Sequence, residues 1–124
     1  MSEKPTPREQ MIWDLLITAV EGAIGYWSTV SGYKWRNDDG EDCAPSVFVT
    51  PDDEPEIFVS AADIDKAVRR IVKSKLDDEP IRFVSEDTYR AVWDAVRDPE
   101  ESDCDAGVAD QVFQLAALGE IVYG

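Results

Sequence analysis

The most constraining feature of this sequence is an apolar segment near its N-terminus that has the spacing of a helix. Apolar side chains recur at helical intervals over residues 12–23, with few polar residues among them. Ahead of them, Thr6 can cap the helix, Pro7 suits its first position, and Glu9 can reach back to complete a capping box. A helix with so narrow a polar side is normally covered by other elements. The sequence therefore predicts a central helix over residues 6–25.

The middle of the chain predicts an antiparallel sheet. Residues 26–35 are rich in aromatic and β-branched side chains, which are typical of a strand. Residues 46–50 and 56–59 predict two more strands, joined by a hairpin loop because the prolines and acids between them do not suit the interior of a sheet. Residues 120–123 predict a closing strand.

Three further helices are expected over residues 60–75, 85–98 and 106–118, where serine caps and helical apolar spacing recur. The order of elements predicts an α+β fold: a small antiparallel sheet of three or four strands covered by about four helices. We expect a single domain over residues 6–124, preceded by a mobile tail over residues 1–5.

The charge of the chain excludes several functions. It carries 27 acidic and 12 basic residues, for a net charge of -15, and has no histidine. A protein that tracks nucleic-acid phosphates is basic, so direct nucleic-acid binding is not expected, and histidine-based catalysis is excluded. The N-terminus has no apolar signal core and no segment suits a membrane span, which favours a cytoplasmic location with Cys43 and Cys104 as free thiols.

The acids are concentrated in two segments, residues 37–56 and residues 98–110, neither of which contains a base. We take most of these acids as candidate partner-binding residues: Asp38, Asp39, Glu41, Asp42, Asp52, Asp53, Glu54, Asp98, Glu100, Glu101, Asp103 and Asp105. Four bases share one face of the second helix and form a secondary candidate contact: Lys66, Arg69, Arg70 and Lys73.

Each charged group has two interpretations. The acids could imitate the charge of a nucleic-acid backbone if they gather on one face, or they could simply keep the protein in solution. The four bases could pair with the acidic loops, each pair contributing about 0–1 kcal/mol, or they could contact an acidic partner or a second subunit.

The motifs for metal, phosphate and nucleophile chemistry are incomplete. A calcium-binding loop that starts at Trp35 would need acidic residues at its first and twelfth positions, but these positions are Trp35 and Ser46. Two cysteines without histidine do not make a zinc site, and their acidic neighbours should raise the pKa of both thiols. Glu21 lies among apolar residues at the end of the first predicted helix. A hydrogen-bonded position at the rim of that helix is the favoured interpretation. We therefore expect no cofactor, no metal and no enzymatic activity.

Four aromatic residues precede the first acidic loop: Tyr26, Trp27, Tyr33 and Trp35. They could form a stacking platform for bases, but such platforms lie in positive grooves and this one adjoins an acidic loop. Packing into the core is the favoured interpretation.

Two stretches carry a resemblance to a known group of proteins. Residues 21–27 (EGAIGYW), and the ending GEIVYG at 119–124 that follows the DQV of 110–112, resemble small accessory proteins encoded by actinobacterial phages. That group has no assigned activity, so the resemblance implies a context only: a small protein in the host cytoplasm, acting on a host or defence protein.

The leading hypothesis is a non-enzymatic acidic protein that binds and modulates or inhibits a basic partner, such as a nucleic-acid-binding enzyme, with DNA mimicry as one mode. The alternative is a self-assembling accessory protein, for example a homodimer formed by aromatic strands, whose acids only keep it soluble.

Overall fold

The computed structural model describes residues 4–36, 39–40 and 42–124, and it confirms the predicted α+β domain. Its elements, in chain order, are α1 (Pro7–Gly22), β1 (Ser28–Arg36), β2 (Asp42–Pro51), β3 (Ile57–Ser60), α2 (Ala61–Asp77), α3 (Glu86–Arg97), the short 3-10 helix η1 (Pro99–Glu101) and α4 (Ala106–Leu118). The tail expected over residues 1–5 lies mostly outside the described residues.

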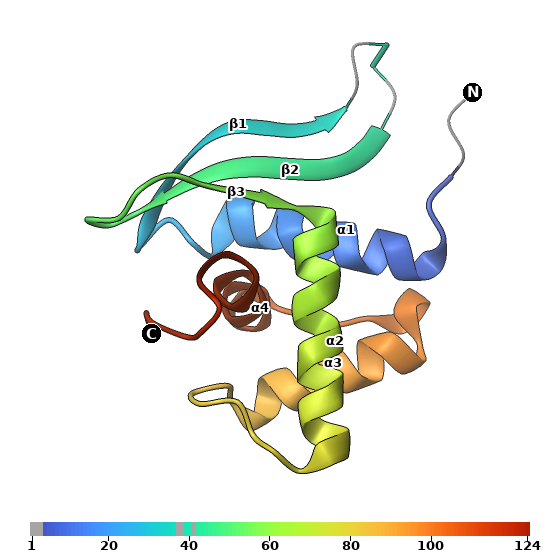
Figure 1. The fold of residues 1–124 in the computed structure, drawn as a ribbon. Coiled ribbons are helices and arrows are strands. Elements are labelled where there is room, and N and C mark those ends of the chain that lie inside the picture. Colours follow the sequence, from blue (N-terminus) through green and yellow to red (C-terminus); the bar gives the residue numbers. More distant parts are fainter. Residues whose placement is uncertain (1–3, 37–38, 41) are drawn as a thin grey trace.

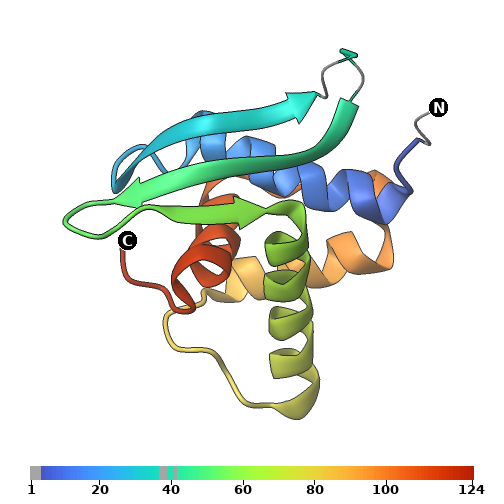
Figure 2. The ribbon, with the colours of Figure 1, turned by 45° about the horizontal axis from the view of Figure 1, so that its top comes forward.

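The three strands form one antiparallel sheet in the order β1-β2-β3, and the helices all lie on one side of it. Figure 1 shows α1 and α4 beneath the sheet, with α3 farthest from it and α2 running from the sheet down to α3. In Figure 2, the sheet comes forward and no helix covers its front. The sheet therefore has an inner face against the helices and an uncovered outer face.

The central position of α1 is confirmed. The Thr6 N–H donates to Glu9 Oε1 at 3.0 Å, and the Glu9 N–H donates to Thr6 Oγ1 at 3.1 Å. These two bonds complete the predicted capping box. Leu16 and Ala19 are fully buried and Met11, Ile12 and Leu15 nearly so. The helix ends at Gly22 rather than at residue 25.

Strand β2 is the middle strand, and its side chains alternate between the two faces. Val47 and Val49 are fully buried on the inner face, whereas Phe48 between them points outward and is 39% exposed. The register pairs Val47 with Val59 and Phe48 with Phe58, so β3 presents the same alternation. The predicted hairpin between these strands is confirmed.

The predicted closing strand over residues 120–123 is wrong, because a buried side chain takes the place of a neighbouring strand. Gln114 on α4 is fully buried, and its Oε1 accepts the backbone N–H groups of Val122 and Tyr123 at 2.8 and 2.9 Å. Its Nε2 donates to the Tyr123 carbonyl at 2.9 Å. With those backbone groups satisfied, the segment packs on the helices outside the sheet.

Candidate functional site

The acids of the first segment are divided between two turns at opposite ends of the sheet. Asp39 lies in the turn between β1 and β2, and the exposed residues Asp52, Asp53 and Glu54 lie in the turn between β2 and β3. Since β2 has ten residues, these turns are separated by about 30 Å. Asp38 and Glu41 lie outside the described residues, and Asp42 begins β2.

The second acidic segment lies on the helical side of the molecule. η1 contacts α1, and Glu100 lines a hollow of about 340 Å³ between them. Asp105 has a structural role, because its side chain caps α4 by accepting the N–H of Val108 at 2.9 Å. Asp98, Glu101 and Asp103 are exposed. The described acids of these two segments therefore lie in three places.

The four bases of α2 are exposed, as the helical spacing predicts. Arg69 pairs with Asp65 at 2.6 Å and Lys73 with Asp77 at 2.8 Å, each one helical turn apart. Arg70 donates to the Gly119 carbonyl at 2.6 Å. Pairing with the acidic loops is thus wrong for Arg69 and Lys73, whose partners belong to their own helix because residues four apart are neighbours there.

The outer face of the sheet carries an exposed aromatic pair at its centre. The rings of Phe48 and Phe58 lie 5.1 Å apart and are tilted by 55°, and Phe58 is 53% exposed. Register and alternation place Ser31, Ser46 and Thr50 around them on the same face. Small polar side chains surround the rings, so the rings form the apolar centre of a polar surface.

Gly32 fits this surface to the Phe48 ring. A β-carbon at Gly32 would lie 2.9 Å from Cδ2 of Phe48, which is closer than van der Waals contact. The backbone of Gly32 is left-handed, with φ of +57°, and the register of β1 shifts between Ser31 and Lys34. A glycine in this bulge lets the ring lie against the backbone of the neighbouring strand.

Charges of both signs border the aromatic pair. Lys34 pairs with Ser46 across the sheet and so lies on the outer face, towards the end of β1. The opposite end holds the acidic turn of Asp52, Asp53 and Glu54, next to the start of β1, where Ser28 pairs with Pro51. The face therefore has an apolar centre and an acidic end.

The expected burial of the other four aromatics is only partly right. Trp27 is in the core, where it stacks on Tyr123 with ring centroids 5.0 Å apart and its Nε1 donates to Asp110 at 2.9 Å. Tyr26 and Trp35 are 58% and 45% exposed, so core packing is wrong for these two.

Two tyrosine–carboxylate contacts tie the start of the sheet to the helices. The hydroxyl of Tyr33 donates to Glu21 at 3.0 Å, and that of Tyr26 donates to Asp110 at 2.5 Å. Burial, then the hydrogen bond to Asp110, raises the pKa of Tyr26 to about 12. Burial and the bond to Glu21 likewise raise the pKa of Tyr33. Both phenols stay protonated at neutral pH, and Glu21 has the rim position expected of it.

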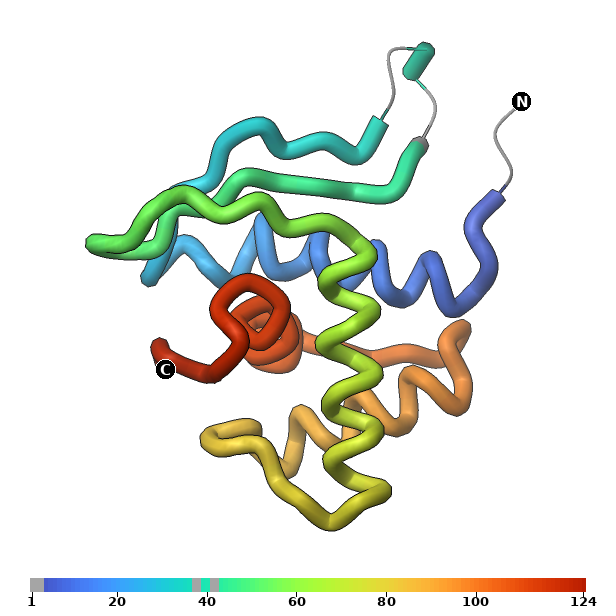
Figure 3. The backbone as a smooth tube through the Cα atoms, in the orientation of Figure 1, coloured from blue at the N-terminus to red at the C-terminus, as the bar shows by residue number. Residues whose placement is uncertain are grey.

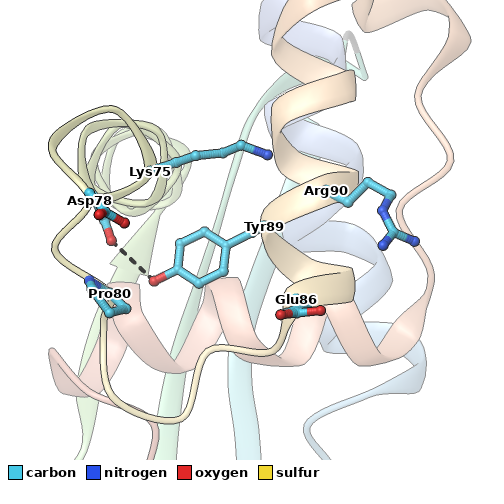
Figure 4. A pocket seen from close by; sticks show the side chains of 7 residues that line it. Lys75, Asp78, Pro80, Glu86, Tyr89 and Arg90 are labelled. Carbon is cyan, nitrogen blue, oxygen red and sulfur yellow. Dashed lines mark hydrogen bonds between the residues drawn. The ribbon is translucent and has the colours of Figure 1, made fainter.

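A hollow of about 320 Å³ lies between the end of α2 and the start of α3 (Figure 4). Tyr89 reaches from α3 towards the loop after α2, where its hydroxyl accepts the N–H of Ile81 at 2.7 Å. Since Ser74 Oγ donates to the Glu79 carbonyl at 2.6 Å, the Tyr89 hydroxyl donates its own proton to Ser74, 3.1 Å away. The polar groups that line this hollow therefore bond to one another and hold the loop between the two helices.

Among the described residues, the thiols and carboxylates form no cluster of potential metal ligands. Cys43 and Cys104 are free, and burial raises the pKa of the Cys104 thiol, with Asp105 and Asp103 adding to the effect. The predicted direction is thus confirmed for Cys104, although burial is the larger cause. Within residues 4–36, 39–40 and 42–124, no group of three or more potential metal-ligating side chains is close enough to hold an ion.

Comparisons with protein-family models, with curated proteins and with solved structures find no match for this chain. In the described part of the chain, no helix is both long and apolar enough to cross a membrane.

Sequence reasoning missed the exposed Phe48–Phe58 pair. A signal was present in the alternation: Ser46 and Thr50 share the parity of Phe48, while Val47 and Val49 have the other. The polar set marks the outward face, so Phe48 had to point outward with it.

Proposed function

We propose that this protein is a non-enzymatic interaction protein that binds a basic surface of a partner protein through the outer face of its sheet. The observation that carries the proposal is the Phe48–Phe58 pair, exposed at the centre of an uncovered face with an acidic turn at one end. Protein interfaces commonly have this anatomy, an apolar centre containing aromatic anchors with a polar rim.

The energetics assign different roles to the rings and the acids. Burying a fully exposed phenylalanine contributes about 1.5–3 kcal/mol. Phe48 and Phe58 are 39% and 53% exposed, so covering the rest of each ring would contribute about 1 kcal/mol and supply the apolar part of the affinity. Asp52, Asp53 and Glu54 are exposed, and exposed charges act mainly by speeding encounter with a basic surface and by excluding acidic ones. The partner is therefore expected to carry an apolar pocket bordered by Lys or Arg.

This arrangement favours a protein contact over imitation of a DNA strand. A DNA mimic needs a continuous strip of charge, whereas the described candidate acids of the two segments lie in three places, and the centre of the face is aromatic. The resemblance to phage accessory proteins extends the proposal to a host or defence protein as the target. A nucleic-acid-binding enzyme stays within the class, since such enzymes present basic surfaces.

The test is affinity capture from nuclease-treated lysate with matched variants. The double variant F48S/F58S removes the aromatic centre, and Phe83→Ser is the control, because Phe83 is 65% exposed in the loop between α2 and α3, away from the sheet. We expect the wild type and the control to retain a common basic protein that the double variant loses. Purified, that protein should bind the wild type more weakly as salt rises. Equal retention by the double variant would refute the proposal.

A second candidate is self-association through the same face, which the exposed rings and the edge position of β1 also permit. Two observations weigh against it. Lys34 and the bulge at Gly32 are features that discourage pairing of edge strands, and a net charge of -15 makes two copies repel. Sedimentation decides between the two: a stable dimer at micromolar concentration, abolished by F48S/F58S, would favour self-association.

A further inference from the structure

The corner of the outer face beside Phe58 carries a carboxylate that has no partner within the described chain. Glu56 is exposed and directly precedes β3, so alternation places it on the outer face with Phe58, about 7 Å away along the strand. In the part of the chain that the structure describes, its side chain makes no hydrogen bond and no ion pair. Figure 3 follows the backbone from the acidic turn through β3 into α2.

The charges around this corner are acidic. Asp52, Asp53 and Glu54 occupy the turn that leads into it. The base of the outer face, Lys34, lies at the opposite corner, because it pairs with Ser46 in the row beyond the two rings. Two strand spacings and four residues separate the Cα atoms of Lys34 and Glu56 by about 17 Å, which is beyond the Debye length of about 8 Å at physiological salt. Lys34 therefore does not neutralise Glu56.

Elsewhere the chain covers aromatic rings with its own cations. The guanidinium of Arg82 lies 4.7 Å from the centre of the Phe83 ring, and the ammonium of Lys75 lies 5.1 Å from that of Trp93. Both distances are within the range at which a cation is attracted to a ring. Among the described residues, no cation lies over Phe58, which is 53% exposed. The chain thus leaves an acidic, aromatic corner open to a cation from another molecule.

We propose that this corner binds an arginine side chain of the basic partner, with the guanidinium lying on the Phe58 ring and its N–H groups donating to the Glu56 carboxylate. The inference rests on the proposed function, because it names the basic group that the outer face receives. Arginine fits better than lysine because its planar guanidinium stacks on a ring, donates two parallel bonds to one carboxylate and is more weakly hydrated than an ammonium. Glu56 is then the residue that determines specificity at this face.

The test uses three peptides and the purified full chain. Each is a heptapeptide with two leucines around its central residue and glycine and serine elsewhere. The central residue is arginine, lysine or citrulline, which keeps the shape of arginine without its charge. NMR titration of isotopically labelled protein measures each affinity and locates the contact through the aromatic signals of Phe58. We expect the arginine peptide to bind at least about threefold more tightly than the lysine peptide, and the citrulline peptide to bind most weakly.

Matched variants isolate the carboxylate and the ring. Glu56→Gln and Glu101→Gln each remove one negative charge at an exposed position, and Glu101 lies in η1 on the helical side. Glu56→Gln should abolish the preference for arginine over lysine, whereas Glu101→Gln should retain it. Phe58→Leu should weaken binding of the arginine peptide about threefold, and Phe83→Leu, at a ring that already carries Arg82, should change it less than about twofold.

Three results would overturn the inference: equal affinity of the arginine and lysine peptides, a preference that survives in Glu56→Gln, or signal shifts centred on Phe83 instead of Phe58. Because the substituted side chains are exposed, the variants should fold, and their NMR spectra report it directly.

The peptide titration needs no partner from a lysate, so this inference and the proposed function can fail separately. If F48S/F58S loses the captured basic protein but the arginine peptide shows no preference, the face binds its partner through another group and the inference is wrong. If the arginine peptide is preferred but F48S/F58S retains every captured protein, the corner binds arginine as inferred and the proposed function is wrong.

Discussion

At the scale of single residues, the buried side chain of Gln114 connects α4 to the C-terminal segment. Its amide makes hydrogen bonds to the backbone of Val122 and Tyr123, and Nε2 also donates to Asp110 at 3.0 Å. Asp110 in turn accepts from Trp27, on which Tyr123 is stacked. One amide therefore holds together the helix, the segment that follows it and the tryptophan of the core.

Replacing Gln114 with leucine should destabilise the fold by about 1–3 kcal/mol, since two partly buried N–H groups lose their acceptor. Urea unfolding at neutral pH measures the change. Gln10→Leu is the control, because Gln10 is exposed and bonds only to Asp14 in its own helix; its effect should be within about 0.5 kcal/mol. A Gln114→Leu effect as small as that of the control would show that the segment is not held by this amide.

Asp65 provides a pH-dependent contribution to stability. Burial alone would raise its pKa, but hydrogen bonds from Arg69 and Arg8 outweigh burial and lower the pKa below the ordinary value of 3.8. A group with a lowered pKa in the folded state stabilises the fold above its unfolded-state pKa. That stabilisation is lost as the pH falls through the folded-state value.

Asp65→Asn should therefore cost up to about 1 kcal/mol at pH 7, because the pairs are partly exposed. The difference from wild type should shrink once the pH falls below about 4. Urea unfolding at several pH values gives both numbers, with Asp94→Asn, at an exposed position of α3, as the control. A difference that stays constant from neutral to acidic pH would rule out the charge of Asp65 as its cause.

At the scale of elements, the sequence predicts what local signals determine. The helices follow from caps such as Thr6 and Ser85, each of which accepts a backbone N–H in its first turn, and from a left-handed Gly119 that ends α4. The strands of the hairpin follow from alternation. The prediction of a closing strand was wrong because the backbone of this segment bonds to Gln114, a side chain on α4. Nothing in the sequence of the segment itself indicates that contact.

The candidate site was harder to predict for a related reason. The acids were evident in the sequence, but their division between three places depends on the length of β2 and on the packing of η1 against α1. The aromatic pair depends on which face of the sheet the helices cover. Both are properties of the tertiary structure, whereas the local sequence pattern indicates only which face of its strand Phe48 occupies.

Gly32 should be the position of the sheet most sensitive to a methyl group. Gly32→Ala combines a left-handed backbone with a β-carbon 2.9 Å from the Phe48 ring, and we expect a loss of about 1–3 kcal/mol. In a Phe48→Ala background the contact is gone, so only the backbone part, about 1–2 kcal/mol, should remain. Additive effects in this double-mutant cycle would show that the ring and the glycine do not interact.

At the scale of the whole molecule, one side is a sheet with an aromatic centre and an acidic end, and the other is a set of helices. The helices bury the core against the inner face, whereas Phe48 and Phe58 lie on the outer face, where they contact each other across the two strands. These two exposed rings are what the proposed partner contact would cover.

The most direct test of this account places the photoreactive residue p-benzoyl-phenylalanine at Phe58 in one sample and at Phe83 in another, followed by irradiation in lysate. Both positions are exposed aromatics, so the substitution is equally conservative at each. The account predicts an adduct with one basic protein from position 58 and not from position 83. A crosslink to a second copy of the chain, or the same adducts from both positions, would contradict the claim that the outer face of the sheet binds a partner protein.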